Sequence, residues 1–248
     1  MDDSFAGIAE DYDAMFPRDL AEDSRMLAPL FERRGIKSVL DCACGTGTHV
    51  AMLARQGYDV TGSDASEAML AQARLRLEET GIQARLSSAS WSNLPHVFQE
   101  RFDAVICIGN SLPLATSDDE VAAAVAGMYG VLAPGGVLVI QNRNMDKMIR
   151  EKPDAILNEA DDGYVLFVFE YRDQYVVYKI FYLVTAGADE GKVTHNQFTM
   201  NLLTRPKFER MIKQAGATSY KFFGDSYLSS FSASRSPRLI AAVSKPGN

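Results

Sequence analysis

Cysteine, histidine and tryptophan are scarce in this chain of 248 residues, which contains 3, 3 and 1 of them. An odd, small number of cysteines does not support a disulfide framework and is typical of a cytoplasmic protein. Structural zinc needs four ligands, but Cys42 and Cys44 are followed by neither a second cysteine pair nor a spaced histidine pair. We therefore expect no disulfide network and no metal site.

The chain also lacks long hydrophobic runs and an excess of positive charge. No apolar run approaches the roughly 18 residues that span a bilayer, and the start, Met1-Asp2-Asp3, is unlike a secretory signal. The net charge is −7 and the isoelectric point is near 5.1, whereas phosphate-rich partners attract basic surfaces. These absences argue against a nucleic-acid or membrane partner and favour a soluble, cytoplasmic protein.

A glycine turn follows the first strongly apolar segment. The segment ends at an acid, and two glycines come directly before a predicted helix: Val39-Leu40-Asp41-Cys42-Ala43-Cys44-Gly45-Thr46-Gly47-Thr48. Glycine lets the backbone turn tightly and lets a ligand lie directly on the main chain, while the amides at the helix start point toward it. This pattern is typical of a nucleotide-type cofactor site.

The spacing around this turn narrows the cofactor. A dinucleotide-binding fingerprint requires a third glycine where this chain has Val50. Asp64 lies seventeen residues after Gly47, at the end of the next apolar segment, where a carboxylate can accept hydrogen bonds from both ribose hydroxyls. We therefore predict a nucleoside cofactor without a diphosphate, and S-adenosylmethionine fits that description.

Two motifs then resemble those of class I S-adenosylmethionine-dependent methyltransferases: Asp41-x-Ala43-Cys44-Gly45-Thr46-Gly47 and Asp64-Ala65-Ser66-x-x-Met69-Leu70. Three further stretches are similar to glycine and sarcosine N-methyltransferases: Ser90-Trp91, Ile108-Gly109-Asn110-Ser111 and Asn142-Arg143-Asn144. The resemblance covers residues 36–144. It implies that the cofactor is bound by Asp41, Ala43, Gly45, Thr46, Gly47, Asp64, Ala65, Ser90, Trp91 and Ile108.

Several of these residues have a second interpretation. Asp64 either binds the ribose or is simply an acid at a helix start. Asp41 either reaches the amine of the cofactor's methionine or only stabilises the turn. Trp91 either stacks on adenine or fills the core as an ordinary buried indole.

Arg143 is the main candidate for binding the methyl acceptor. It follows an apolar strand, and a guanidinium there can hold a carboxylate through two parallel hydrogen bonds. The resemblance implies this role for Arg143 and places Asn110 opposite it, near the acceptor. Arg143 could instead pair with Asp146 and fix the loop.

The sequence departs from the glycine methyltransferase pattern in two places. Leu112-Pro113-Leu114 replaces a segment with a histidine, and Phe198-Thr199-Met200-Asn201-Leu202-Leu203 lacks the tyrosines expected near the acceptor. Tyr12 and Tyr227 are candidate substitutes for those side chains.

Strands and helices alternate from residue 36, which predicts an α/β fold with a doubly wound, Rossmann-like, seven-stranded, mostly parallel sheet. We expect an N-terminal flap and helix (1–35), a cofactor-binding core (36–144), an inserted antiparallel β lobe (145–203) and a C-terminal segment completing the core (204–248). The lobe should contain three strands, at about 164–171, 174–186 and 192–203, after an irregular or weakly helical stretch over 145–160.

The sequence thus predicts a methyltransferase that N-methylates a small amino acid or carboxylated amine and that could form a homo-oligomer. Three alternatives stay open: an N- or O-methyltransferase of a larger metabolite, a nicotinamide oxidoreductase, and a cofactor-binding protein without catalysis.

Overall fold

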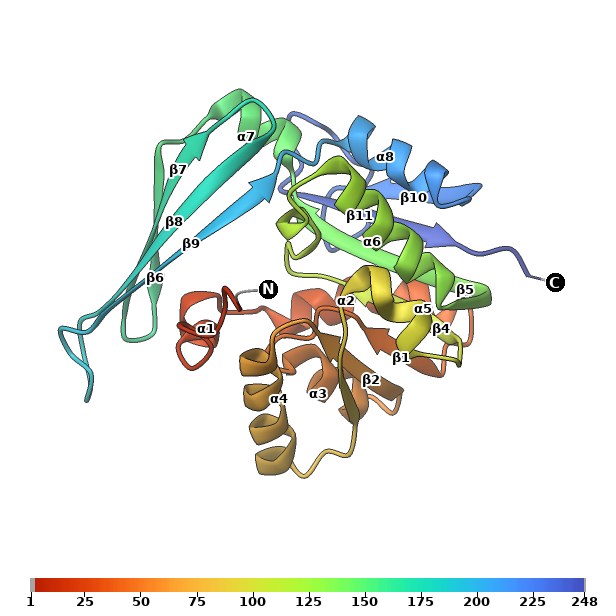
Figure 1. Ribbon diagram of the computed structural model, residues 1–248, viewed down its shortest axis with the longest axis horizontal. Helices are drawn as coiled ribbons and strands as arrows, with labels where there is room; N and C mark the ends of the chain where they lie inside the picture. The colour runs from red at the N-terminus through yellow and green to blue at the C-terminus, as the bar shows by residue number, and fades with distance from the viewer. Residues whose placement is uncertain (1–2, 248) are drawn as a thin grey trace.

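The computed structural model describes residues 3–247 and contains two β-sheets (Figure 1). Residues 1–2 of the expected flap and residue 248 of the expected C-terminal segment lie outside the described residues. The larger sheet has seven strands in the order β10-β11-β5-β4-β1-β2-β3. Its strands are β1 (Ser38–Asp41), β2 (Asp59–Asp64), β3 (Arg85–Ser88), β4 (Phe102–Cys107), β5 (Leu132–Arg143), β10 (Ser219–Phe223) and β11 (Arg238–Ser244).

The predicted fold class is confirmed. Strands β1 to β5 pair in parallel, and only β11 runs against both of its neighbours, β5 and β10. Because all five parallel strands end at the same edge of the sheet, the loops that follow them meet there. That edge holds most of the residues that the sequence singles out.

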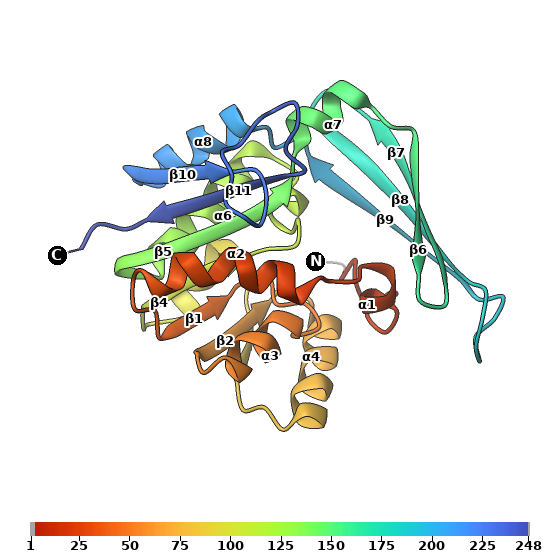
Figure 2. The same cartoon turned by 180° about the vertical axis from the view of Figure 1, so that it is seen from behind.

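Helices cover both faces of this sheet because successive strand residues point to opposite sides. Val39 belongs to a buried cluster with α2, α3 and α4, whereas Leu40 belongs to a second cluster with α5, α6 and α8. Figure 2 shows α2 crossing one of the two faces. The helices are α2 (Leu20–Glu32), α3 (Thr48–Arg55), α4 (Glu67–Thr80), α5 (Leu94–Val97), α6 (Asp118–Gly130) and α8 (Arg205–Gln214).

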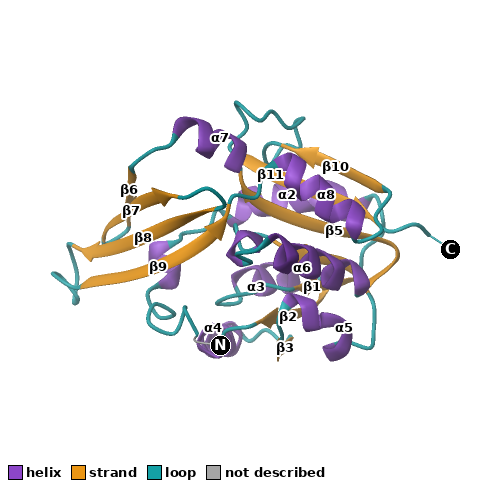
Figure 3. Ribbon diagram, turned by 45° about the horizontal axis from the view of Figure 1, so that its top comes forward, coloured by secondary structure: helices purple, strands orange, loops and turns teal. Residues whose placement is uncertain are grey.

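The second sheet is an antiparallel lobe inserted between β5 and α8. It follows a short helix and has four strands in the order β6-β7-β8-β9. These elements are α7 (Met145–Glu151), β6 (Ala155–Ala160), β7 (Gly163–Tyr171), β8 (Tyr175–Val184) and β9 (Val193–Asn201). Helices gather around the larger sheet, while the lobe extends to one side (Figure 3).

The expectation of three strands in the lobe was wrong, because β6 forms a fourth. Its sequence, Ala-Ile-Leu-Asn-Glu-Ala, contains only one β-branched residue and lacks the alternation of a half-buried strand. Pairing with β7 nevertheless continues from Ala155↔Val168 to Ala160↔Gly163 through a tight turn. A strand at a sheet edge depends on such a neighbour more than on its own propensity.

The N-terminal flap, residues 3–18, includes the short helix α1 (Tyr12–Met15) and lies between the two sheets (Figure 1). Ile8 and Met15 are 2% exposed and belong to the same buried cluster as the inward side chains of the lobe. None of the helices within residues 3–247 is both long enough and apolar enough to cross a lipid bilayer.

Candidate functional site

The glycine turn after β1 has the backbone geometry that the sequence predicts. Gly45 and Gly47 have φ values of +53° and +79°, in the left-handed region that favours glycine. A Cβ on Gly47 would also lie 3.0 Å from the Cβ of Ala73 in α4. Both positions therefore require glycine, and α3 begins directly after the turn with Thr48.

Asp64, at the end of β2, joins the two sequence motifs. Its Oδ2 accepts a hydrogen bond of 2.8 Å from the Gly45 amide, and its Oδ1 accepts one of 3.0 Å from the Ser66 amide. Burial raises the pKa of this carboxyl, and the backbone amides oppose the shift. Each carboxylate oxygen keeps a further lone pair, so ribose hydroxyls can bind in addition.

Asp41, at the end of β1, is only 1% exposed. Its Oδ1 lies 3.3 Å from the Ala43 amide, while its Oδ2 has no hydrogen-bond partner within residues 3–247. Burial raises the pKa of Asp41 to about 6. A buried carboxylate oxygen without a partner is a site where a ligand's ammonium group could bind.

Arg18, which the sequence did not indicate, brings a positive charge close to Asp41. It comes from the flap, and its guanidinium packs so closely against Gly109 that any side chain at 109 would collide with it. Gly109 has a φ of +91°. The charge of Arg18 counteracts the burial that raises the pKa values of Asp41 and Tyr12. Position 18 belongs to no recognisable motif, so only the three-dimensional structure could reveal it.

The flap contacts both cofactor motifs. Asp13 accepts a hydrogen bond of 2.8 Å from Thr46 in the glycine turn and pairs with Arg76 of α4. Asp3 accepts a hydrogen bond of 2.8 Å from the hydroxyl of Ser66, the N-cap residue of α4. The described part of the flap therefore lies against both motifs.

Tyr12 is one of the predicted site residues, and the structure places it here. Burial raises the pKa of its hydroxyl, the Arg18 guanidinium lowers it, and the Asp64 carboxylate raises it further. The Tyr12 hydroxyl therefore lies near the Arg18 guanidinium and the Asp64 carboxylate. Its ring packs against Phe16, with 4.8 Å between the ring centroids.

The predicted adenine side is formed by residues that follow β3 and β4. Trp91 is partly buried and packs against the cluster under α5, α6 and α8, while Ser90 is exposed. Ile108 is 2% exposed and belongs to the opposite cluster. The amide of Ala89 donates a hydrogen bond of 2.9 Å to the carbonyl of Asp64, which holds this loop beside the ribose candidate. An adenine contact of Trp91, Ala43, Ala65 or Ile108 stays a prediction.

Arg143 and Asn110 lie next to each other at the carboxyl edge of the sheet. The Arg143 amide donates a hydrogen bond of 2.9 Å to Asn110 Oδ1, and the Asn110 amide group lies 3.5 Å from the sulfur of Met200. Asn110 has a φ of +66°, a conformation that asparagine tolerates better than most residues. Its side chain therefore positions the Arg143 backbone.

The Arg143 guanidinium faces the tyrosines on the inner side of the lobe. Burial raises the pKa of Tyr178 to about 12 and raises the pKa of Tyr171, and the positive charge of Arg143 opposes both shifts. Within residues 3–247 Arg143 forms no ion pair. Asp146 instead accepts a hydrogen bond of 2.8 Å from the Arg205 amide, so the structure does not form the alternative Arg143–Asp146 pair.

Tyr227 is the predicted residue that the structure does not bring to the others. It is 74% exposed, and the Arg25 guanidinium lies 5.0 Å from its ring centroid. It lines a groove between α2 and the strands β10 and β11, away from Arg143. The loop after β10 carries no local signal that would tell which way such an exposed ring points.

Metal-binding side chains do not gather in the part of the chain that the structure describes. No three histidine, cysteine or acidic side chains of residues 3–247 are placed to hold an ion. The three cysteines are buried and unpaired, and Cys42 donates a hydrogen bond of 3.1 Å to the carbonyl of Ile106.

Comparison with known proteins finds similarity to methyltransferases. Residues 39–136 match the methyltransferase domain family. The chain is 34% identical over 158 residues to a glycine/sarcosine N-methyltransferase of Aphanothece halophytica, covering 58% of this chain and 60% of that protein. The chain thus spans only part of the curated relatives that it matches.

Solved structures of methyltransferases share this fold over nearly the whole chain. An S-adenosylmethionine-dependent methyltransferase from Clostridium acetobutylicum has a TM-score of 0.84 at 19% identity, covering 96% of this chain and 98% of that one. A sugar N-methyltransferase from Streptoalloteichus has a TM-score of 0.71 at 25% identity, covering 92% and 89%. The chain therefore carries a methyltransferase domain with the fold of the S-adenosylmethionine-dependent enzymes.

Proposed function

We propose that the chain, which carries an S-adenosylmethionine-dependent methyltransferase domain, methylates the nitrogen of a small amino acid or another carboxylated amine. The observation that carries the proposal is Arg143, a cation at the active edge of the sheet that has no acidic partner within residues 3–247. A guanidinium in this position suits bidentate binding of a carboxylate. The similarity to glycine/sarcosine N-methyltransferases supports the same acceptor class.

The residues around the glycine turn fit S-adenosylmethionine, which supplies an activated methyl group when it is bound. Asp64 would accept hydrogen bonds from the ribose hydroxyls. Asp41, with its unpartnered Oδ2, and Arg18, with its free charge beside Gly109, would bind the ammonium and the carboxylate of the cofactor's methionine. Asp41 would thus pair with the positive ammonium, and Arg18 would pair with the negative carboxylate.

Methyl transfer to an amine needs little acid–base chemistry from the protein. The residues must hold the neutral amine in line with the methyl group and keep water away. Arg143 would fix the acceptor through its carboxylate, and Asn110 would hold the Arg143 backbone in place. The flap and the inner face of the lobe would cover the reacting atoms. The amine's proton can leave to solvent as the acceptor binds.

The test is formation of S-adenosylhomocysteine with glycine, sarcosine and a panel of other amines, for the wild type and for Arg143→Ala. We expect turnover on an amino acid to fall about 100-fold or more in Arg143→Ala, because a charged acceptor loses its partner. Arg143→Lys should retain part of the activity, since it keeps the charge but loses the planar fork. Arg150→Ala, on the exposed side of α7, is the matched control. Equal turnover in Arg143→Ala would contradict the carboxylate assignment.

A second acceptor class is an amine on a larger metabolite such as an amino sugar. The whole-length similarity to a sugar N-methyltransferase favours including it. Leu112-Pro113-Leu114 and the tyrosine-poor β9 also depart from the glycine methyltransferase pattern. If S-adenosylhomocysteine binds tightly but no amino acid is methylated, turnover on amino sugars in the same panel would select this second class.

A further inference from the structure

The groove that Tyr227 lines is positively charged, although the chain as a whole has a net charge of −7. Three of its lining residues are bases, Arg33, Arg34 and Lys221, and none is an acid. All three bases are exposed, and they form no ion pair within residues 3–247. Charge of one sign gathered at a concave surface attracts a ligand of the opposite sign.

The groove forms where the edge of the seven-stranded sheet extends beyond α2. Figure 2 shows the two strands at this edge, β11 and β10, to one side of α2. Ser219 pairs with Ser244 and Lys221 pairs with Ala242, so these four side chains point to one side of the sheet. From the opposite wall, the Arg34 guanidinium donates a hydrogen bond of 3.0 Å to Ser244 Oγ. The bases of the helix and of the strand therefore gather at the same end of the groove.

An aromatic ring lies at the other end of the groove. The Arg25 guanidinium covers one face of the Tyr227 ring, which is 74% exposed, so its other face is open for stacking. The loop holds the ring in this position, because Asp225 Oδ1 accepts hydrogen bonds of 3.0 and 3.1 Å from the amides of Tyr227 and Ser229. Leu228 has a φ of +59°, a conformation that is costly for leucine and that is often found at binding sites.

The groove has the dimensions of a small-molecule site. Its volume is about 690 Å³, and pockets for drug-sized ligands measure roughly 300–1,000 Å³. Arg25, beside the ring, lies eight residues before Arg33 along α2, so the two ends are about 12 Å apart at about 1.5 Å per residue. The floor between them is apolar and includes Leu30, Phe223 and Leu228. A ligand that fits this groove has an anionic group at one end and a flat ring at the other.

We propose that this groove binds a nucleoside phosphate, with the phosphate between Arg33 and Lys221 and the base on the open face of Tyr227. Guanidinium groups and an ammonium without acidic partners suit a phosphate. Any base can stack on an aromatic ring, because every base has a π face. The groove is separate from the methyl-transfer site, since none of its lining residues belongs to the glycine turn or to the lobe.

Titration calorimetry with nucleoside monophosphates tests the proposal. The protein is first saturated with S-adenosylhomocysteine, so that the nucleotide cannot enter the cofactor site. We expect adenosine monophosphate and the monophosphates of guanosine, cytidine and uridine to bind with similar dissociation constants, on the order of 100 μM or lower. Adenosine, which lacks the phosphate, and inorganic phosphate, which lacks the base, should each bind at least about tenfold more weakly than adenosine monophosphate.

Substitutions of exposed side chains locate the binding in the groove. Lys221→Ala and Arg33→Ala should each weaken binding of adenosine monophosphate about tenfold, because the phosphate loses a charged partner. Tyr227→Ala should weaken it about fivefold, because the base loses its stacking ring. Arg55→Ala is the matched control, since Arg55 is also an exposed arginine at a helix end, on α3, and does not line the groove. All four variants should bind S-adenosylhomocysteine as the wild type does.

Salt dependence gives a measurement that needs no substitution. The bases of the groove are exposed, so added salt should weaken binding of adenosine monophosphate. The proposal would be overturned if none of the four nucleotides bound at about 1 mM, or if Lys221→Ala and Arg33→Ala bound adenosine monophosphate as the wild type does. Inorganic phosphate that binds as tightly as the nucleotide would equally overturn it, because the ring would then have no part in binding.

Discussion

In the cofactor half of the site, polar groups are held by backbone atoms of the seven-stranded core. In the acceptor half, side chains from separate segments hold one another. Asp64 accepts hydrogen bonds from two main-chain amides, one of 2.8 Å from Gly45 in the preceding glycine turn and one of 3.0 Å from Ser66 in its own loop. Arg143 instead meets Asn110 from the loop after β4 and Tyr178 from the inserted lobe. The first arrangement is fixed by local chain geometry, and the second depends on how the lobe docks.

This difference predicts that cofactor binding and acceptor preference can change independently of each other. A backbone-held cofactor site tolerates a change of acceptor, because no hydrogen bond or ion pair within residues 3–247 joins the glycine turn to the lobe. Acceptor preference can then change through the lobe alone, consistent with a fold that carries many activities. Variants in one half should therefore leave binding to the other half nearly unchanged, and the predictions below test that separation.

The largest expected effect concerns the buried carboxyl of Asp41. Below pH 3.8 the carboxyl is protonated in both the folded and the unfolded state. As the pH rises from 3.8 to about 6, the carboxyl ionises in the unfolded state while it is still protonated in the folded state, so the free energy of unfolding falls. The loss amounts to about 3 kcal/mol, at about 1.4 kcal/mol per pKa unit. Asp41→Asn lacks this loss, so its stability relative to the wild type should increase between pH 4 and 7.

Chemical denaturation at several pH values measures this difference. Asp59→Asn, at the exposed start of β2, is the control and should follow the wild-type profile. Parallel profiles for Asp41→Asn and the wild type would show that Asp41 does not change its ionisation in this range.

Asp64→Ala should weaken binding of S-adenosylhomocysteine about 30-fold, or about 2 kcal/mol, because the ribose loses a charged acceptor and the glycine turn loses its anchor. Titration calorimetry measures the affinity, with Asp59→Ala as the control. The acceptor KM, measured at saturating cofactor, should stay within about twofold of the wild type, as the separation of the two halves requires. Unchanged affinity would reject the ribose assignment.

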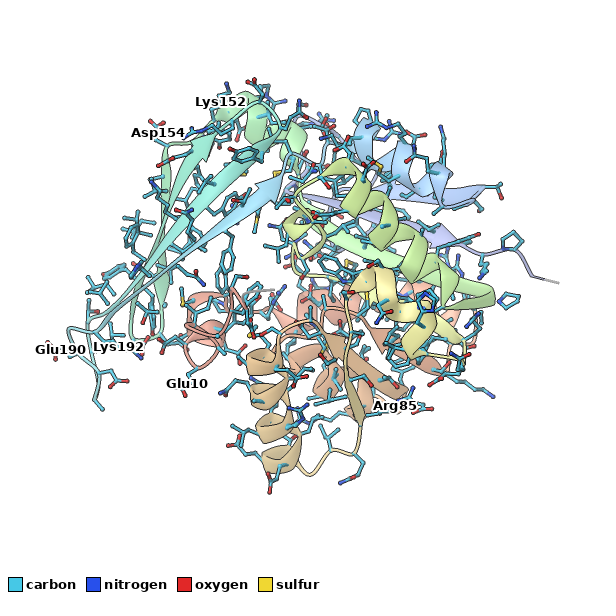
Figure 4. All side chains as sticks on the ribbon, viewed as in Figure 1. Glu10, Arg85, Lys152, Asp154, Glu190 and Lys192 are labelled. Atoms are coloured by element: carbon cyan, nitrogen blue, oxygen red, sulfur yellow. The ribbon has the colours of Figure 1, made fainter. Side chains whose placement is uncertain are left out.

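Asp13→Ala tests the flap as part of the cofactor half. The variant removes the hydrogen bond to Thr46 and the ion pair with Arg76, both partly exposed, so we expect a loss of about 1 kcal/mol, or about fivefold in cofactor affinity. Glu10→Ala, on the exposed side of the same segment near Lys192 (Figure 4), is the matched control. An equal loss in both variants would point to general destabilisation of the flap.

Tyr178→Phe should give the smallest effect, and it should change binding of the acceptor rather than binding of the cofactor. Loss of the hydroxyl beside Arg143 should raise the acceptor KM about threefold, or about 0.7 kcal/mol, without changing cofactor affinity. Tyr175→Phe, on the same strand but exposed on the opposite side of the lobe, serves for comparison. A change in cofactor affinity but not in acceptor KM would break the proposed division of the site.

The parts of the structure that local sequence determines could be predicted. The turn at Gly45 and Gly47 and the position of Asp64 follow from short-range steric and hydrogen-bonding rules, and the parallel sheet follows from the alternation of strands and helices. Arg18 and β6 could not be predicted, because each depends on a neighbour distant in sequence: Gly109 for the arginine and β7 for the strand. Tyr227 shows the same limit, since a tyrosine in a loop carries no signal for its direction.

The flap also has a kinetic consequence. Besides its bonds to Thr46 and Ser66, it reaches the lobe through the Asp11–Lys192 ion pair of 2.9 Å and through Phe5 stacked on Phe198, with ring centroids 4.8 Å apart. The polar contacts are partly exposed and contribute about 1 kcal/mol or less each, whereas burial of Ile8 and of Met15 contributes about 2 kcal/mol each. Apolar contacts therefore make up most of the cost of opening the segment. A spent cofactor that leaves on this side would wait for that opening, so smaller side chains at these two positions should speed its release while weakening retention.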